Sequence, residues 1–131
     1  MLHEGTRKTV CFDLDGVICS GPKSDYEHAK PNPDVVALVN ELHQAGVRIV
    51  IHTARFMGRS GDDAEVAESM GRELTERQLV EWGVRYDKLV LGKPSYDLVI
   101  DDKAAFFRED WSAVRDLSKQ ICGLADGASA P

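Results

Sequence analysis

The sequence predicts an α/β protein with a mostly parallel central sheet, and three stretches in its first half carry this prediction. An apolar run at residues 10–12 has the length and flanks of a short buried strand. Asn32 then offers an N-cap with Pro33 at the first helical position, and apolar residues recur at helical spacing as far as Leu42. The β-branched run 47–51 is typical of a strand covered on both faces. Strand, helix and strand in this order form the repeating unit of a parallel sheet.

Two carboxylates end the first predicted strand. Asp13 and Asp15 lie two residues apart, and because extended backbone has a period of two, both side chains can point to one spot while Leu14 points back into the protein. Gly16 permits the chain to turn sharply away. Ligands bind at the carboxyl ends of strands in open α/β sheets, so these acids are expected on the reactive edge. An Asp after a strand can also serve only as a cap or turn residue, and this pair alone decides nothing.

Polar side chains follow two further predicted strands. Thr53 comes directly after the strand at 47–52, and Asp101 with Asp102 follows the apolar residues 98–100. Capping explains one such strand end, but three in one chain are hard to explain in that way. The sequence therefore predicts a functional site where the strand ends meet.

The second half of the chain is expected to contain helices and two short strands. A loop at 55–61 leads to a helix start at 62–63, the helical pattern weakens near Gly71, and Thr75 resembles the capping box of a second helix. Two helices are therefore expected before residue 83.

Two strands are then predicted close together, at 88–91 and 97–100. Only five residues separate them, whereas parallel neighbours need a crossover of about a dozen residues or more. One of the two is therefore short, peripheral or not a strand. Beyond Asp102 a helix or two is expected.

Length and composition fit a single domain over residues 1–131. Hydrophobic residues make up 43% and charged residues 29%, and a core is expected over about 8–122 with a frayed tail at 123–131. The 22 acidic residues outnumber the 16 basic ones, which disfavours a nucleic-acid partner without excluding it. No apolar run reaches membrane-spanning length and the first residues lack the core of a signal peptide, so a cytoplasmic protein with no membrane partner is expected. The three cysteines lack metal-ligand spacing and are expected to be reduced thiols.

Four motifs together resemble those of the haloacid dehalogenase superfamily of aspartate-nucleophile phosphatases. They are DLDG at 13–16, HTAR at 52–55, GKP at 92–94 and IDDK at 100–103, and the resemblance covers roughly residues 8–110. Within the superfamily the sequence is most similar to small phosphatases without a cap domain that are found with surface-polysaccharide (capsule) biosynthesis. It is more distantly similar to the phosphatase domain of polynucleotide kinases. The resemblance implies a three-layer Rossmann-like sandwich without a cap domain.

The resemblance also implies a phosphomonoester hydrolase that works through an aspartyl-phosphate intermediate. Asp13 would be the nucleophile, and Asp15 would protonate the leaving alcohol and later activate water. Mg²⁺ would reduce the repulsion between the nucleophile and the phosphate dianion, and its oxygen ligands would come from Asp13, the Asp15 carbonyl, Asp101 and Asp102. The phosphate would be bound by Thr53, Ala54, Arg55 and Lys93.

Several of these roles have alternatives. Lys103 competes with Lys93 for the phosphate, because it directly follows the paired aspartates. Asp102 has the alternative role of orienting Asp101 or capping the next helix. His52 is read as a packed histidine. The sequence contains no phosphate-binding P-loop, no nucleophilic serine with a histidine partner and no zinc cluster, so kinase and serine-hydrolase functions are excluded.

The missing cap leaves the substrate open. The loops at 17–31 and 55–61 leave strands at the reactive edge, and their Tyr26, His28 and Arg59 are the candidates for substrate specificity. A homo-oligomer is another way to cover the site. The expected substrate is a small phosphorylated metabolite, a sugar or polyol phosphate. The alternatives are 3′-phosphatase activity on polynucleotides and a non-catalytic module that binds phosphate or a partner.

Overall fold

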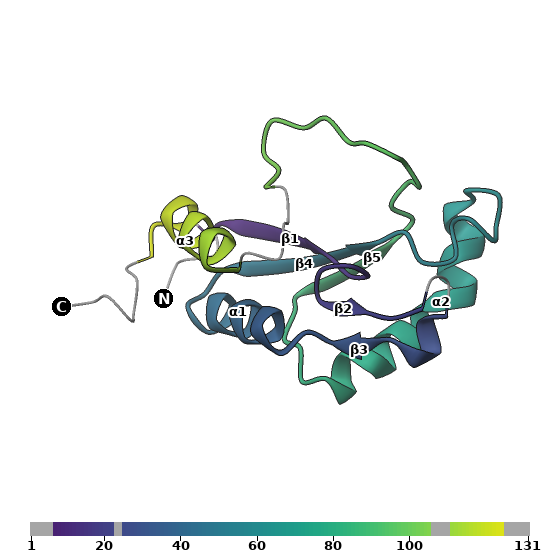
Figure 1. The fold of residues 1–131 in the computed structure, drawn as a ribbon, viewed down its shortest axis with the longest axis horizontal. Helices are drawn as coiled ribbons and strands as arrows, with labels where there is room; N and C mark the ends of the chain where they lie inside the picture. Colours follow the sequence, from purple (N-terminus) through teal and green to yellow (C-terminus); the bar gives the residue numbers. More distant parts are fainter. Residues whose placement is uncertain (1–6, 23–24, 106–110, 125–131) are drawn as a thin grey trace.

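The structure is a computed structural model that describes residues 7–22, 25–105 and 111–124 (Figure 1). Its centre is a three-stranded parallel sheet in the order β1-β4-β5, which comprises β1 (Thr9–Asp13), β4 (Arg48–Thr53) and β5 (Lys88–Leu91). In the register of these strands Asp13 lies opposite His52, and Thr53 lies opposite Leu91. The three strands therefore end at one edge, as the sequence predicted, and the α/β class with a parallel sheet is confirmed.

In the described part of the chain three α-helices accompany the sheet: α1 (Pro33–Gln44), α2 (Ala64–Glu81) and α3 (Trp111–Cys122). The loop after β1 contains a small antiparallel pair, β2 (Cys19–Ser20) with β3 (Lys30–Pro31), around the short 3₁₀ helix η2 (Tyr26–His28). α1 begins after Asn32, an N-cap in extended conformation, with Pro33 in its first turn as predicted. Among the described residues no helix is both long enough and apolar enough to cross a membrane.

α1 and α2 contact the sheet, and the side chains of β4 show which of its faces they cover. Ile49, Ile51 and Thr53 are fully buried, whereas Val50 and His52, which point the other way, are only partly buried. The expectation of a strand covered on both faces is therefore wrong for the described residues. The reason is that the segment on the second side, 92–105, forms neither a helix nor a strand.

α2 is one continuous helix of 18 residues, so the prediction of two helices is wrong. The helix continues through Gly71. The glycine serves close packing, because a Cβ there would lie 2.5 Å from the ring of Phe56. Thr75 does not cap a new helix either, since its side chain is fully buried and accepts a hydrogen bond from Arg55. The helix begins instead at Asp63, whose carboxylate accepts hydrogen bonds from the amides of Glu65 and Val66.

The strand predicted at 88–91 is present as β5, but residues 97–100 are not a strand. Leu98, Val99 and Ile100 are 76%, 50% and 91% exposed. Such a short connection gives no room for a parallel crossover, so of the two predicted strands only the first joins the sheet. The segment runs back toward α3 instead (Figure 1).

α3 confirms the helix predicted after Asp102, although residues 106–110 lie outside the described part of the chain. It docks on α1 through two ion pairs to Glu41, from Arg115 at 3.0 Å and from Lys119 at 2.7 Å. Lys119 is only 5% exposed, so its ammonium group meets the Glu41 carboxylate largely away from solvent.

Candidate active site

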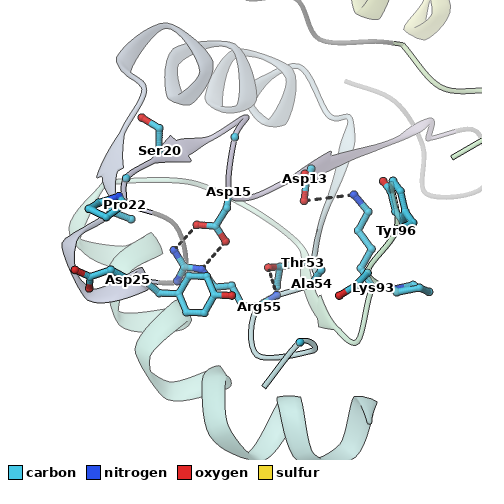
Figure 2. Close-up of a pocket in the computed structure, with 17 residues that line it drawn as sticks. Asp13, Asp15, Ser20, Pro22, Asp25, Thr53, Ala54, Arg55, Lys93 and Tyr96 are labelled. Atoms are coloured by element: carbon cyan, nitrogen blue, oxygen red, sulfur yellow. Dashed lines mark hydrogen bonds and ion pairs between the residues drawn. The ribbon is translucent and has the colours of Figure 1, made fainter. Parts of the chain in front are cut away.

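All six residues predicted for catalysis and phosphate binding line one open pocket at the carboxyl edge of the sheet (Figure 2). The end of β1 supplies the two carboxylates, β4 and the loop after it supply the phosphate-side residues, and the segment after β5 supplies the lysine. The volume of the pocket is about 550 Å³. The six residues are Asp13, Asp15, Thr53, Ala54, Arg55 and Lys93.

Asp13 faces Lys93 across the pocket, with 3.5 Å between Oδ1 and Nζ. The amide of Lys93 donates to the carbonyl of Thr53, which fixes the segment after β5 to the end of β4. Burial raises the pKa of Asp13 above its usual range, and Lys93 acts against this effect. The pKa of Lys93 is also raised: burial acts to lower it, but contacts with Tyr96 and Asp13 outweigh burial. Lys103 does not line this pocket, and its amide donates to the Asp101 carboxylate at 2.7 Å.

Asp15 is held by the guanidinium group of Arg55 in a two-pronged contact. Nε lies 2.8 Å from Oδ2, and one terminal nitrogen lies 3.0 Å from Oδ1. The Arg55 side chain is completely buried, whereas that of Asp15 is 37% exposed and reaches into the pocket. Such a planar pairing fixes both the position and the orientation of a carboxylate. Asp15 is therefore oriented from its buried side and open to a ligand on the other.

Cys19 lies beneath this pair. Its thiol is 3.4 Å from Oδ1 of Asp15 and is buried. Burial, followed by the negative charge of Asp15, raises the pKa of the thiol to about 12, although Arg55 opposes the shift. The thiol therefore stays protonated and packs beneath Asp15.

Two buried residues of α2 hold the far side of Arg55, and the sequence reasoning missed both of them. The second terminal nitrogen of Arg55 donates to Oγ1 of Thr75 at 3.3 Å and to Oε1 of Gln78 at 2.5 Å. In α2 these residues share one face with Ala67 and Gly71, which are also buried. A threonine and a glutamine on the buried face of a helix were the available signal, because such groups require polar partners.

Thr53 shapes the loop on the phosphate side of the pocket. Its hydroxyl is buried and accepts a hydrogen bond from the amide of Arg55 at 3.0 Å. Phe56 then takes a positive φ of 66°, which turns the chain back. The backbone from Thr53 to Arg55 thus forms a tight turn at the rim of the pocket, next to the two carboxylates.

The three residues proposed for specificity are placed differently. Tyr26 lines the pocket, its ring lies 4.9 Å from the Arg55 guanidinium carbon, and its hydroxyl accepts from the amide of Phe56. The Arg59 guanidinium covers the Tyr26 ring at 5.3 Å. His28 does not line the pocket; it is largely exposed and pairs with Asp25 at 2.7 Å, which raises the pKa of the histidine.

The structure does not bring the predicted metal ligands together. Asp13 and Asp15 share the pocket, but Asp101 and Asp102 are exposed and lie outside it. Among residues 7–22, 25–105 and 111–124, no three acidic, histidine or cysteine side chains form a group that could hold a metal ion. Oxygen donors of the right kind for Mg²⁺ are present, but the described residues do not complete a site.

His52 is partly buried beside this region. Burial, followed by the charge of Lys93, lowers its pKa, although Asp13 opposes the shift. A neutral, packed histidine agrees with the sequence-based interpretation.

Comparison with known proteins establishes the fold. No family model matches the sequence, and no curated protein does. A chain of the Pnkp1/Rnl/Hen1 complex superposes with a TM-score of 0.51 at 22% identity, over 74% of this chain and 31% of that one. A D,D-heptose bisphosphate phosphatase from B. bronchiseptica, crystallised with magnesium and phosphate, superposes less well, with a TM-score of 0.47 at 18% identity over 87% of this chain and 63% of that one. The superposition on the Pnkp1/Rnl/Hen1 chain agrees with an α/β fold built on a parallel, Rossmann-like sheet.

A target protein of Vibrio cholerae with a known crystal structure is much more similar. It superposes with a TM-score of 0.70 at 30% identity, over 86% of this chain and 99% of that one. The chain belongs to the same family as this protein of Vibrio cholerae.

Proposed function

We propose that this protein is a phosphomonoester hydrolase that forms an aspartyl-phosphate on Asp13. The observation that carries the proposal is the pairing in the pocket: two neighbouring carboxylates have separate cationic partners, Lys93 for Asp13 and Arg55 for Asp15. Two acids in one cleft with different surroundings are typical of a division between nucleophile and acid/base. The four motifs that resemble those of the haloacid dehalogenase superfamily support a phosphatase-like enzyme.

The proposed reaction has two steps. In the first, a carboxylate oxygen of Asp13 attacks phosphorus, the bond to the leaving oxygen breaks, and the protonated Asp15 gives its proton to that oxygen. In the second, Asp15 takes a proton from a water molecule that attacks phosphorus, the bond from phosphorus to Asp13 breaks, and phosphate leaves. Lys93 stabilises the charge on the phosphoryl oxygens, because its ammonium group already faces Asp13.

Charge balance supports Mg²⁺ as the cofactor. With Asp15 protonated for the first step, the charge of Asp13 cancels that of Lys93, and Arg55 leaves one positive charge. A bound phosphate dianion therefore leaves one negative charge uncompensated. A divalent cation would neutralise it and polarise the phosphoryl group. The described residues do not assemble a third ligand beside Asp13 and Asp15, so the metal would be held next to these two residues and would supply positive charge.

The proposed substrate is a small sugar or polyol phosphate, handled by a domain without a cap. The volume of about 550 Å³ fits a small metabolite, and beyond the carboxylates the pocket is lined by Asp25, Tyr26 and Tyr96, which can meet hydroxyl groups and a sugar face. Among the described residues no second folded unit covers the opening. A place in surface-polysaccharide synthesis rests on the sequence resemblance alone.

The test is phosphate release from a panel that contains p-nitrophenyl phosphate, sugar phosphates and a 3′-phosphorylated oligonucleotide. Wild-type protein should turn over the aryl phosphate and at least one sugar phosphate, and Asp13→Asn should abolish multiple turnover of both. Asp34→Asn, an exposed acid in the first turn of α1, is the matched control and should retain activity. Silence of the wild type across the panel would favour a binding module, and activity on the oligonucleotide alone would favour a polynucleotide phosphatase.

A further inference from the structure

Gln78 is a buried glutamine in the middle of a helix. It is 5% exposed, and its neighbour on the same face, Thr75, is completely buried. Burying an amide side chain is unfavourable unless its donor and its acceptor both find partners. Apolar residues would fill this part of α2 at lower cost, so the partners of Gln78 indicate why a polar residue stands there.

Both ends of the Gln78 amide are used. Oε1 accepts a hydrogen bond from a terminal nitrogen of Arg55 at 2.5 Å, and the amide nitrogen donates to the carbonyl of Tyr26 at 2.7 Å. One side chain of α2 thus binds the arginine that holds Asp15 and also the backbone of the loop that lines the pocket.

The planar shape of guanidinium makes the first of these contacts directional. Its three nitrogens lie in one plane, so anchoring one terminal nitrogen on Gln78 and Thr75 restricts rotation of the whole group. The remaining edge, Nε and the other terminal nitrogen, is the edge that contacts the two oxygens of Asp15. Without the anchor, the group can turn about the bonds of its own side chain and Asp15 loses its fixed orientation.

The second contact fixes one wall of the pocket to the same group. The Tyr26 ring lies 4.9 Å from the Arg55 guanidinium carbon and packs edge-on against Phe56. Because Gln78 also holds the Tyr26 carbonyl, the pocket wall formed by Tyr26 keeps a constant position relative to Asp15. Misplacing a catalytic group by about one ångström can cost on the order of a hundredfold in rate.

We propose that Gln78 is a positioning residue that orients Asp15 through Arg55 and holds the Tyr26 wall beside it. The proposal rests on the proposed function, since it concerns the proton transfer to the leaving group. It separates the two halves of the glutamine: the acceptor oxygen serves the acid/base, and the donor nitrogen serves the wall.

Two variants and a control test this division. Gln78→Met keeps the length of the side chain and removes both hydrogen bonds, whereas Gln78→Glu keeps an acceptor for Arg55 and loses the donor to Tyr26. Glu73→Met, an exposed change on the same helix, is the control. kcat and KM are measured on p-nitrophenyl phosphate, whose leaving group needs little protonation, and on glycerol 1-phosphate, whose leaving group needs much.

Gln78→Met should lower kcat for glycerol 1-phosphate about tenfold or more, and for the aryl phosphate less than about threefold. Gln78→Glu should recover most of that kcat, because Arg55 keeps its acceptor. Its KM for glycerol 1-phosphate should stay above that of the wild type, because the hydrogen bond to the Tyr26 carbonyl is lost. The control should match the wild type on both substrates. Equal losses on both substrates, or no recovery in Gln78→Glu, would overturn the proposal and reduce Gln78 to a packing residue.

A second measurement does not depend on turnover. The Nε–H group of Arg55, which donates to Asp15, gives an NMR signal that Arg55→Lys identifies by its disappearance. The exchange of this proton with solvent should be slow in the wild type, Glu73→Met and Gln78→Glu, and at least about tenfold faster in Gln78→Met. If the wild type hydrolyses no phosphate ester, the proposed function fails while this result still supports the positioning contact. Unchanged exchange in a folded Gln78→Met, or fast exchange in Gln78→Glu, would contradict the positioning contact.

Discussion

Asp13 and Asp15 stand two residues apart and have different electrostatic surroundings. Asp13 shares the open pocket with one lysine at 3.5 Å, and burial raises its pKa. Asp15 rests against an arginine whose side chain is fully buried. A carboxylate that is partly desolvated and only loosely paired is a better nucleophile than one held in a two-pronged ion pair, so the roles of the two acids follow from their partners.

The raised pKa of Asp13 predicts that the nucleophile reduces stability. In acid the Asp13 carboxyl is protonated in both states and its burial costs no stability. Because the folded-state pKa lies above the unfolded one, the folded state loses stability as pH rises through the folded pKa. Asp13→Asn should therefore have a Tm equal to or above that of the wild type at neutral pH, and the difference should shrink in acid. Thermal unfolding followed across this range, with Asp34→Asn as control, measures it. A marked loss of Tm at neutral pH would show that the contact with Lys93 outweighs burial.

Lys93 should set the acidic limb of the pH–rate profile. Its positive charge lowers the pKa of Asp13, so in Lys93→Met the nucleophile stays protonated to a higher pH. We expect kcat/KM to fall on the order of a hundredfold, and the acidic limb to move toward higher pH. Lys103→Met is the comparison that separates the two lysines. If that variant loses as much activity as Lys93→Met, Lys103 contacts the phosphate during turnover.

The helices and strands show where local sequence patterns are sufficient and where they are not. β1, α1 and β4 were predictable, because each combines a clear apolar period with a capping residue or a polar strand end. The prediction of two helices in place of α2 is wrong, because local propensity alone was used at Gly71 and Thr75. The roles of these residues depend on tertiary partners, Phe56 and Arg55. Gln78 was missed for the same reason.

Gly71 allows α2 to approach the loop that follows β4. A Cβ at this position would lie 2.5 Å from the Phe56 ring, which is buried, belongs to a residue with positive φ and packs against Tyr26. Gly71→Ala should therefore lower the free energy of unfolding by about 1–3 kcal/mol, although alanine favours a helix. Chemical denaturation measures this, with Gly58→Ala as control because its Cβ would meet nothing within 4 Å. If Gly71→Ala were neutral or stabilising, the Phe56 ring would be free to move.

At the scale of the whole molecule, the site is complete on one side of the sheet and incomplete on the other. The side covered by α1 and α2 supplies the anchored Asp15, whereas the segment 92–105 carries Asp101 and Asp102 away from the pocket. The sequence pattern at 97–100 predicts a strand, and the structure leaves its apolar residues exposed. The pattern was insufficient here because strand formation depends on a partner edge and on chain length between strands.

Metal dependence tests whether Asp101 and Asp102, which lie outside the pocket in the structure, act together with Asp13 and Asp15. A bound phosphate dianion leaves the pocket with uncompensated negative charge, so chelator should abolish phosphate release and Mg²⁺ should restore it. Ca²⁺, which is larger and accepts looser geometry, should bind without supporting turnover. Asp101→Ala should raise the Mg²⁺ concentration needed for half-maximal rate more than Asp102→Ala does, as the sequence motif predicts. If both variants respond to Mg²⁺ as the wild type does, these aspartates stay outside the pocket during turnover, as in the structure. Full activity in excess chelator would show instead that Lys93 and Arg55 supply all the positive charge that the reaction needs.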